Sequence, residues 1–279
     1  MKQRAFISLV AAGIIAGTTG ILIKYIEMDA KAIAWVRMGL PTILLGAWLL
    51  FRKKSIIRPG YQSMLAASLL NAIRLYLYIL AFVLTSLANA TVLFYSYPIF
   101  AAVLGYLFLK EKVLHLHKFL ILTSFAGLII AYSDRSFSIM DDDLIGMTSA
   151  LMAAIIYALT VIIFKSRVTH FNQIEMIFYQ NLAGGILFLP FFLIGLPIMT
   201  TSDFLFSSTY AIVVGLGVFY LFFLGLKYLK AYMASAIMYL EVVSAVVLGY
   251  LVLGEVITPR MMIGGSMIIF SSFLLNQSK

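Results

Sequence analysis

Long apolar segments alternate with short polar breaks along the whole chain. The apolar runs extend over about 17–24 residues, the length that an α-helix needs to cross the hydrocarbon core of a bilayer. Because the breaks are short, consecutive helices are expected to be antiparallel neighbours. We therefore predict an all-α polytopic membrane protein with ten transmembrane helices, at residues 4–23, 30–51, 61–84, 87–109, 117–133, 143–164, 173–196, 208–227, 231–253 and 260–276.

The second half of the chain repeats the text of the first. Residues 95–111 read YSYPIFAAVLGYLFLKE, and residues 239–255 read YLEVVSAVVLGYLVLGE. At this shift of 144 residues Tyr95 falls on Tyr239 and Glu111 falls on Glu255, and at a shift of 141 the first predicted helix matches the sixth. Apolar helices share letters by chance, but lipid does not favour the matched polar residues. We therefore predict two five-helix repeats, residues 1–135 and 141–279.

An odd number of helices in each half would place the second repeat in the membrane upside down. Inverted repeats are typical of secondary transporters, which bind substrate near the bilayer midplane between the halves. The basic residues support this topology, because 14 of the 20 would share one side with both termini: Lys2, Arg4, Arg52, Lys53, Lys54, Arg58, Lys110, Lys112, Lys118, Lys165, Arg167, Lys227, Lys230 and Lys279. The other side keeps Lys24, Lys31, Arg135 and Arg260. We expect cytoplasmic termini in a bacterial inner membrane.

The composition narrows the class of protein further. Hydrophobic residues make up 63% of the chain and charged residues 11%, far from the balance of a soluble domain. The net charge of +9 is spread over short loops without a basic face, which argues against nucleic-acid binding. There is no cysteine, so disulfides and thiolate metal sites are excluded. The opening apolar run is longer than a signal-peptide core, so we expect it to be a retained helix.

Three ionisable side chains fall inside predicted membrane spans: Arg37, Arg74 and Glu241. Such residues are costly in lipid and mark substrate or ion pathways. Glu241 stands where the first repeat has Tyr97, so it is one of the positions at which the two copies differ. It is a candidate for binding a cationic group or carrying a coupling proton. The alternative is an internal salt bridge to Arg37 or Arg74.

Further polar positions accompany these charges. Arg37 lies four residues before Pro41, and its repeat counterpart is Gln180; a structural arginine that caps carbonyl groups is an equal alternative. Asn71, Arg74 and Tyr78 share one helix face, where Arg74 would meet an anionic group of the substrate. The repeat counterpart of Arg74 is Val218. The aromatic candidates for the cavity lie mid-span or beside polar groups: Tyr78, Tyr95, Tyr97, Tyr157, Tyr179 and Tyr239.

Motifs for other functions are missing from the sequence. It contains no phosphate-binding loop, no H-E-x-x-H and no G-x-S-x-G, so no ATP hydrolysis, catalytic residue, metal or cofactor is expected. His115, His117 and His170 are expected to be solvated loop residues. Glu111 and Glu255 end corresponding helices in both copies and are interpreted as structural. The expected partners are a small-molecule substrate and the bilayer, with the chain a monomer or homodimer.

The duplicated text resembles that of a known family. The endings AAVLGYLFLKE and SAVVLGYLVLGE, the segments LANATVLFYSYPIF and AYMASAIMYLEVV, and WVRMGL at 35–40 are similar to EamA-type transporters of the drug/metabolite transporter superfamily. The resemblance implies ten helices, a central cavity and secondary transport of a small polar or amphipathic metabolite, such as an amino acid or related zwitterion. Alternatives are a nucleoside-like or S-adenosylmethionine carrier and a carrier of drugs or quaternary amines. A membrane scaffold and a membrane-embedded enzyme are less favoured.

Overall fold

The computed structural model describes residues 1–133, 141–196 and 199–277, and every regular element within these ranges is a helix. The first half contains α1 (Lys2–Ala16), α2 (Thr19–Lys24), α3 (Ala30–Phe51), α4 (Tyr61–Leu84), α5 (Leu87–Phe94), α6 (Tyr97–Leu109) and α7 (His115–Tyr132). The second contains α8 (Asp141–Arg167), α9 (Gln173–Leu187), α10 (Leu189–Gly195), α11 (Thr201–Tyr210), the π-helix η2 (Ala211–Val218), α12 (Phe219–Tyr228), α13 (Ala231–Ile237), α14 (Leu240–Leu253) and α15 (Pro259–Gln277). Arg135 and Lys279, used in the charge argument, lie outside the described residues.

The all-α membrane architecture is confirmed for this part of the chain, but the count of ten spans is not. Eight stretches are long and apolar enough to cross a bilayer. A ninth is a bent pair, α9 and α10, which meet at an angle of 59°. Pro190 at the start of α10 explains the bend, because proline lacks the N–H that would continue the helix. The apolar part of α15, Pro259–Leu275, is shorter.

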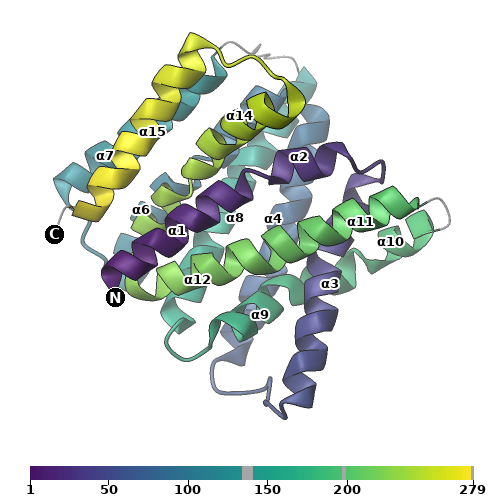
Figure 1. Ribbon diagram of the computed structural model, residues 1–279. Coiled ribbons are helices and arrows are strands. Elements are labelled where there is room, and N and C mark those ends of the chain that lie inside the picture. The colour runs from purple at the N-terminus through teal and green to yellow at the C-terminus, as the bar shows by residue number, and fades with distance from the viewer. Residues whose placement is uncertain (134–140, 197–198, 278–279) are drawn as a thin grey trace.

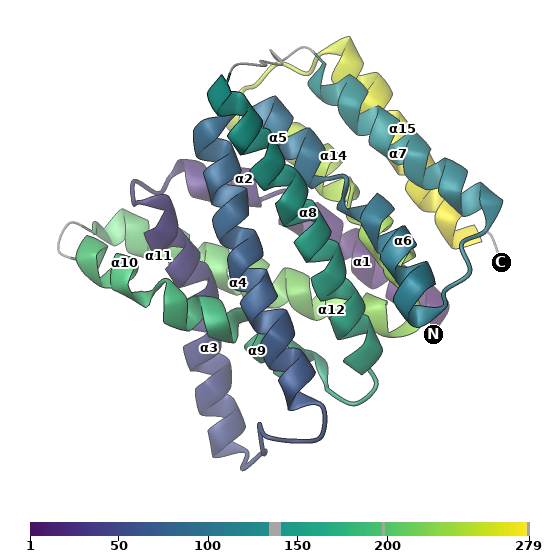
Figure 2. The same ribbon diagram turned by 180° about the vertical axis from the view of Figure 1, so that it is seen from behind.

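The helices form one bundle in which both termini lie at the same end (Figure 1). We call this end, where α1 begins and α15 finishes, the terminal side, and the other end the opposite side. In Figure 1 the long span α11–η2–α12 crosses in front of α3 and α4, and α7 and α15 lie side by side at the edge. Figure 2 shows from behind that α4 and α8 pack together along their length. Helices of the first half of the sequence thus pack directly against helices of the second half, as α4 does against α8.

Two helices are interrupted at equivalent places in the repeat. The break between α5 and α6 falls at residues 95–96, and Pro98 is the second residue of α6; the break between α13 and α14 falls at residues 238–239. An interrupted helix leaves backbone carbonyl groups without their usual partners. The Tyr239 hydroxyl donates to the Tyr95 carbonyl at 2.7 Å, and the Tyr97 hydroxyl donates to the Ser235 carbonyl at 3.3 Å. Each break is therefore stabilised by a tyrosine from the other half of the chain.

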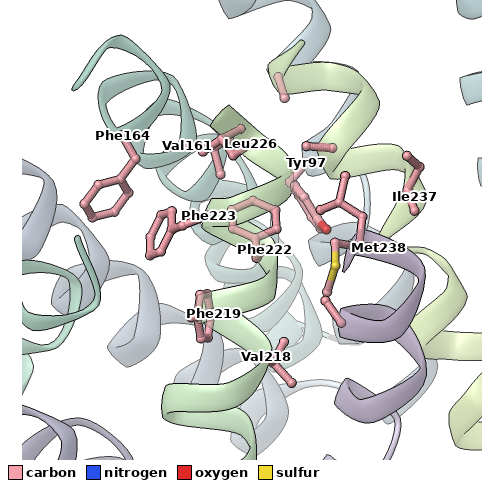
Figure 3. Close-up of a cluster of buried hydrophobic side chains, with 14 of the residues drawn as sticks. Tyr97, Val161, Phe164, Val218, Phe219, Phe222, Phe223, Leu226, Ile237 and Met238 are labelled. Carbon is pink, nitrogen blue, oxygen red and sulfur yellow. The ribbon is translucent and has the colours of Figure 1, made fainter. Parts of the chain in front are cut away.

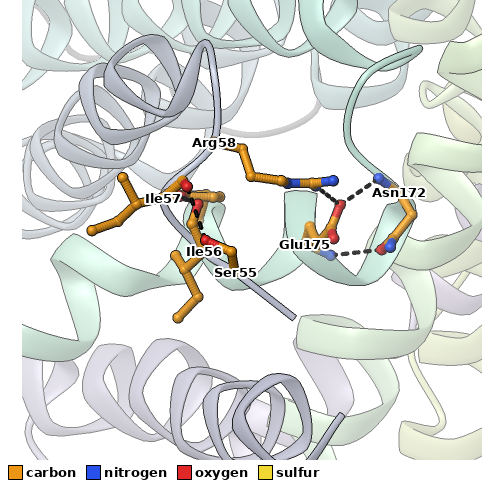
Figure 4. Close-up of polar contacts among 7 residues, drawn as sticks. Ser55, Ile56, Ile57, Arg58, Asn172 and Glu175 are labelled. Atoms are coloured by element: carbon orange, nitrogen blue, oxygen red, sulfur yellow. Dashed lines mark hydrogen bonds and ion pairs between the residues drawn. The ribbon is translucent and has the colours of Figure 1, made fainter. Parts of the chain in front are cut away.

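The terminal side is closed by polar contacts between the two halves. Arg58, between α3 and α4, forms an ion pair with Glu175 at the start of α9, where Asn172 and Glu175 make a reciprocal capping box (Figure 4). The Tyr179 hydroxyl donates to the Ile56 carbonyl at 2.6 Å. Further along, Arg167 donates to the Ser63 hydroxyl at 2.9 Å.

Candidate functional site

A cavity of about 110 Å³ lies between the two halves of the bundle, beside both helix breaks. One water molecule requires roughly 10–15 Å³ measured in this way, so the cavity has room for a compact ligand or several waters. It is lined by charged, aromatic and apolar side chains: Ala16, Thr19, Arg37, Arg74, Leu75, Tyr78, Phe94, Tyr95, Tyr97, Tyr157, Tyr210, Val214, Val218, Phe219, Phe222, Met238 and Glu241. All three ionisable residues found inside predicted spans are among them.

Arg74 is held in place by a short hydrogen-bonded chain. Its Nε donates to Asn71 Oδ1 at 3.1 Å, and Asn71 Nδ2 donates to the Gln180 carbonyl at 2.8 Å. The guanidinium also stands 5.1 Å from the ring centroid of Tyr157. Asn71 is fully buried, so this chain fixes where α4 presents its positive charge.

Arg37 reaches the cavity from a locally weakened part of α3. Pro41 has no N–H to donate to the Arg37 carbonyl four residues earlier. Gly215 of η2 packs against that carbonyl, and a Cβ at Gly215 would lie 3.0 Å from its oxygen. The Arg37 guanidinium lies 5.1 Å from the Phe219 ring centroid, and its buried Nη1 has no hydrogen-bond partner. Arg37 therefore does not act as a carbonyl cap in the described structure, and it keeps a free donor at the cavity.

Glu241 lies in the first turn of α14, at the second helix break. It lines the cavity together with Tyr95, Arg37 and Arg74, and both arginines act on its carboxylate electrostatically. Neither arginine forms an ion pair with it. The three charges thus share one cavity without neutralising one another by direct contact, which is the arrangement that leaves them able to bind a ligand.

Four of the proposed site residues lie outside the cavity lining: Asn71, Tyr179, Gln180 and Tyr239. Asn71 and the Gln180 backbone position Arg74, and Tyr239 holds the Tyr95 carbonyl. Tyr179 points instead to the terminal side, where its hydroxyl donates to Ile56. A mid-span tyrosine in the sequence cannot be assigned to the cavity without knowing which way its helix face turns.

Some of the remaining lining residues follow from a signal already in the sequence, the shift between repeats. Six pairs of lining residues are repeat counterparts: Ala16 with Tyr157, Arg74 with Val218, Leu75 with Phe219, Tyr78 with Phe222, Phe94 with Met238, and Tyr97 with Glu241. Applying the shift to Arg74 and Tyr78 would have identified Val218 and Phe222. Five lining residues have no such partner in the lining: Thr19, Arg37, Tyr95, Tyr210 and Val214. Tyr210 immediately precedes η2, a helix type that is frequent at functional sites.

Aromatic side chains fill the space between the cavity and the terminal side. We call Phe164, Phe219, Phe222 and Phe223 the aromatic plug (Figure 3). Phe164 of α8 and Phe223 of α12 meet with ring centroids 5.0 Å apart. Because α8 and α12 both run towards the terminal side, Phe164 and Phe223 lie further towards that side than Phe219 and Phe222, which line the cavity.

The L-x-E endings form matching helix caps. The Glu111 N–H donates to the Gly105 carbonyl at 3.0 Å, and the Glu255 N–H donates to the Gly249 carbonyl at 3.2 Å. The Glu111 carboxylate then accepts from the Ala231 N–H at 3.0 Å, at the start of α13. Burial raises the pKa of Glu111, while this N–H and Lys165 oppose the rise. Both glutamates thus have a local structural role, and Glu111 also joins the two halves.

One expectation about the histidines is wrong. His115 and His170 are exposed, but His117 is buried in α7, with its Nδ1 2.7 Å from the Tyr232 hydroxyl. The first turn of α7 packs against α13, so a position that hydropathy assigns to a loop edge lies inside the bundle. Within the described residues, no group of three or more His, Cys, Asp or Glu side chains is placed to hold a metal ion.

A family profile, two curated proteins and a solved structure match most of this chain. The sequence profile of the EamA-like transporter family matches residues 3–133 and again 144–277. An uncharacterised transporter of Archaeoglobus fulgidus is 26% identical over 271 residues, which cover 94% of this chain and 92% of that protein. One of Clostridium kluyveri is 29% identical over 208 residues, covering 68% and 63%. A crystal structure superposes with a TM-score of 0.83 at 16% identity, over 98% of this chain and 96% of that one, and shows the fold alone.

Apolar spans, a charged central cavity and these matches support an integral membrane protein and point to a transporter rather than an enzyme. The chain belongs to the EamA-like transporter family, part of the drug/metabolite transporter superfamily.

Proposed function

We propose that the protein is a secondary transporter of a small zwitterionic metabolite, such as an amino acid or related compound. The observation that carries this proposal is the meeting of Arg37, Arg74 and Glu241 at one cavity without an ion pair between them. Such charges inside a membrane protein need a partner. A ligand with one anionic and one cationic group supplies both partners at once.

The positions of the charges define how the ligand would bind. Its anionic group would face Arg74, which Asn71 holds in place, and the free Nη1 of Arg37. Its cationic group would face Glu241, beside the rings of Tyr95 and Tyr97. Glu241 is also our candidate for the coupling proton, because it is the only acidic residue lining the cavity in the described structure. A quaternary-amine carrier is the second candidate, favoured by these aromatic rings around one carboxylate.

The transport mechanism that fits these features is alternating access between inverted repeats of residues 1–135 and 141–279. On the terminal side Glu111 binds the Ala231 N–H. The repeat counterpart of this contact would join Glu255 to the N–H of Leu87, but Glu255 is exposed, and among the described residues its carboxylate has no hydrogen-bond partner. In an inverted repeat, the contact on one side can break while its counterpart on the other side forms, so that one side opens as the other closes. The aromatic plug is consistent with a conformation closed at the terminal side.

The orientation follows from the basic loops. We propose that the terminal side is cytoplasmic, in a bacterial inner membrane, since most basic residues lie there. The chain would act with the bilayer and its substrate as partners, as a monomer or homodimer, without cofactor, metal or nucleic acid.

Ligand-induced thermal stabilisation of the purified protein tests the proposed site. A panel of amino acids, adenosyl compounds, vitamins and quaternary amines should contain a zwitterion that raises the unfolding midpoint. Glu241→Gln and Arg74→Gln should weaken its binding by on the order of tenfold or more, which corresponds to about 1.4 kcal/mol. Glu27→Gln, which changes an exposed carboxylate outside the cavity, is the matched control and should bind as the wild type does.

A charge exchange distinguishes binding from a structural ion pair. If Glu241 and Arg74 only stabilised each other, Glu241→Arg combined with Arg74→Glu would restore both stability and transport. The separation of the two side chains predicts that the exchange restores neither ligand binding nor transport. Full transport by Glu241→Gln at every pH would remove Glu241 from the site and from proton coupling.

A further inference from the structure

A large apolar groove lies on the outside of the bundle between α6 and α7, remote from the central cavity. Its walls include Val103, Tyr106 and Leu107 of α6 and Leu122 of α7, all of which are exposed. Its volume is about 790 Å³, against about 110 Å³ for the cavity. Because both helices belong to membrane spans, this groove faces the hydrocarbon region of the bilayer.

The end of the groove at the terminal side is basic. Lys112, His115 and Lys118 line it there, and all three side chains are exposed. The adjacent acid, Glu111, does not neutralise them, because its carboxylate is turned towards the Ala231 N–H. The Lys112 carbonyl accepts a hydrogen bond from Lys230 Nζ at 2.7 Å, which ties the connecting loop to the bundle. The lysines at this end of the groove are therefore not paired with Glu111, and the loop backbone that carries Lys112 is anchored to the bundle.

The repeat supplies an internal comparison. The corresponding groove between α14 and α15, lined by Val243, Val247 and Met262 among others, has a volume of about 210 Å³ and no basic lining residue. Val247 is the repeat counterpart of Val103. The scaffold therefore produces a groove in both halves, but only the one opening at the terminal side is wide and ends in lysines.

From this combination we infer that the α6–α7 groove binds an anionic phospholipid. An acyl chain occupies the apolar walls, and the phosphate lies at Lys112 and Lys118, with His115 beside them. Basic pockets between transmembrane helices hold anionic headgroups in this way, because each lysine or arginine near the surface attracts the anionic group. The occupant is a lipid and not a soluble phosphate, because most of the groove is hydrocarbon surface.

Native mass spectrometry of the full chain in detergent tests the site, with phosphatidylglycerol and phosphatidylcholine of identical acyl chains as the two probes. The wild type should retain one phosphatidylglycerol in preference to phosphatidylcholine. Lys112→Gln with Lys118→Gln should weaken phosphatidylglycerol binding about tenfold or more and leave phosphatidylcholine binding unchanged. Lys53→Gln with Lys54→Gln removes the same charge from exposed residues on the same side and should have no such effect.

A second variant tests the groove itself. Val103→Trp fills the apolar wall without touching the lysines, and it should also displace the lipid. Equal binding of the two lipids by the wild type, wild-type affinity in the double lysine variant, or wild-type affinity in Val103→Trp would each overturn the inference. So would a homodimer that Val103→Trp dissociates, because the groove would then be covered by a second copy of the chain.

Discussion

At the scale of single residues, the two repeats solve the same backbone problem with different side chains. The cap after α6 has Lys110 in the left-handed region, with φ 54°, and the cap after α14 has Gly254 there, with φ 68°. Glycine adopts this conformation freely, whereas a side chain with a Cβ is strained. The duplicated cap therefore carries local strain in its first copy alone.

Replacing Lys110 by glycine should stabilise the protein. The change relieves the left-handed strain, and we expect about 0.5–1 kcal/mol after the greater flexibility of glycine in the unfolded chain is counted. The reverse substitution, Gly254→Lys, should destabilise it by a similar amount. Thermal unfolding midpoints in one detergent at one scan rate compare the two. A lower midpoint for Lys110→Gly would contradict the proposed strain.

At this scale the sequence identifies buried charges, but it does not show which way a side chain points. Arg37, Arg74 and Glu241 were identifiable because an ionisable group inside an apolar span is rare. Tyr179 was not separable from Tyr97, because both lie mid-span and only tertiary packing turns one to the cavity and the other to Ile56. His117 was misplaced for the related reason that hydropathy does not show which side of a helix is covered.

At the scale of helices, close approach depends on glycine at particular contacts. Where α7 and α15 cross, a Cβ on Gly264 would lie 2.2 Å from the Gly127 carbonyl oxygen, and one on Gly127 would lie 2.7 Å from that of Gly264. Both neighbours are backbone atoms, so no side chain can turn aside. Small residues at such crossings let membrane helices approach closely, which strengthens their van der Waals packing.

Gly264→Ala should therefore separate α7 from α15. We expect destabilisation of about 1–3 kcal/mol, seen as a lower thermal midpoint. Gly20→Ala is the control, because no atom lies within 4 Å of its added Cβ and alanine favours a helix. An unchanged midpoint for Gly264→Ala would show that the two helices do not approach as closely as described.

The contact of Glu111 with α13 should bias which side of the protein is open. Glu111→Ala removes the acceptor for the Ala231 N–H and should favour opening at the terminal side, whereas Glu255→Ala should leave that side closed. The chain has no cysteine, so a single cysteine introduced at Thr19 in the cavity can report access by a membrane-impermeant maleimide.

In intact cells, labelling at this position should be readily detected in the wild type and should fall in Glu111→Ala. Wild-type labelling in Glu111→Ala would remove this contact from the mechanism. Labelling only from the cytoplasmic face would reverse the proposed orientation.

At the scale of the whole molecule, the repeat explains both what was predictable and what was not. The positions of the apolar segments, the all-α class and the duplicated text follow directly from hydropathy and spacing. The 59° bend between α9 and α10 was not, because the span of 173–196 is apolar on both sides of Pro190. The joint lining of the cavity by six repeat-related pairs was implicit in the shift of 144 and 141 residues, but only the structure shows that both members face inward.

In the proposed function, the chain alone moves a zwitterion through the cavity that holds Arg37, Arg74 and Glu241. Uptake of the stabilising ligand by liposomes that contain only the purified chain tests it most directly. We predict saturable uptake without ATP, reduced about tenfold or more by Glu241→Gln and unaffected by Glu27→Gln. Uptake that strictly requires ATP or a second protein, or equal uptake by Glu241→Gln and the wild type, would contradict it.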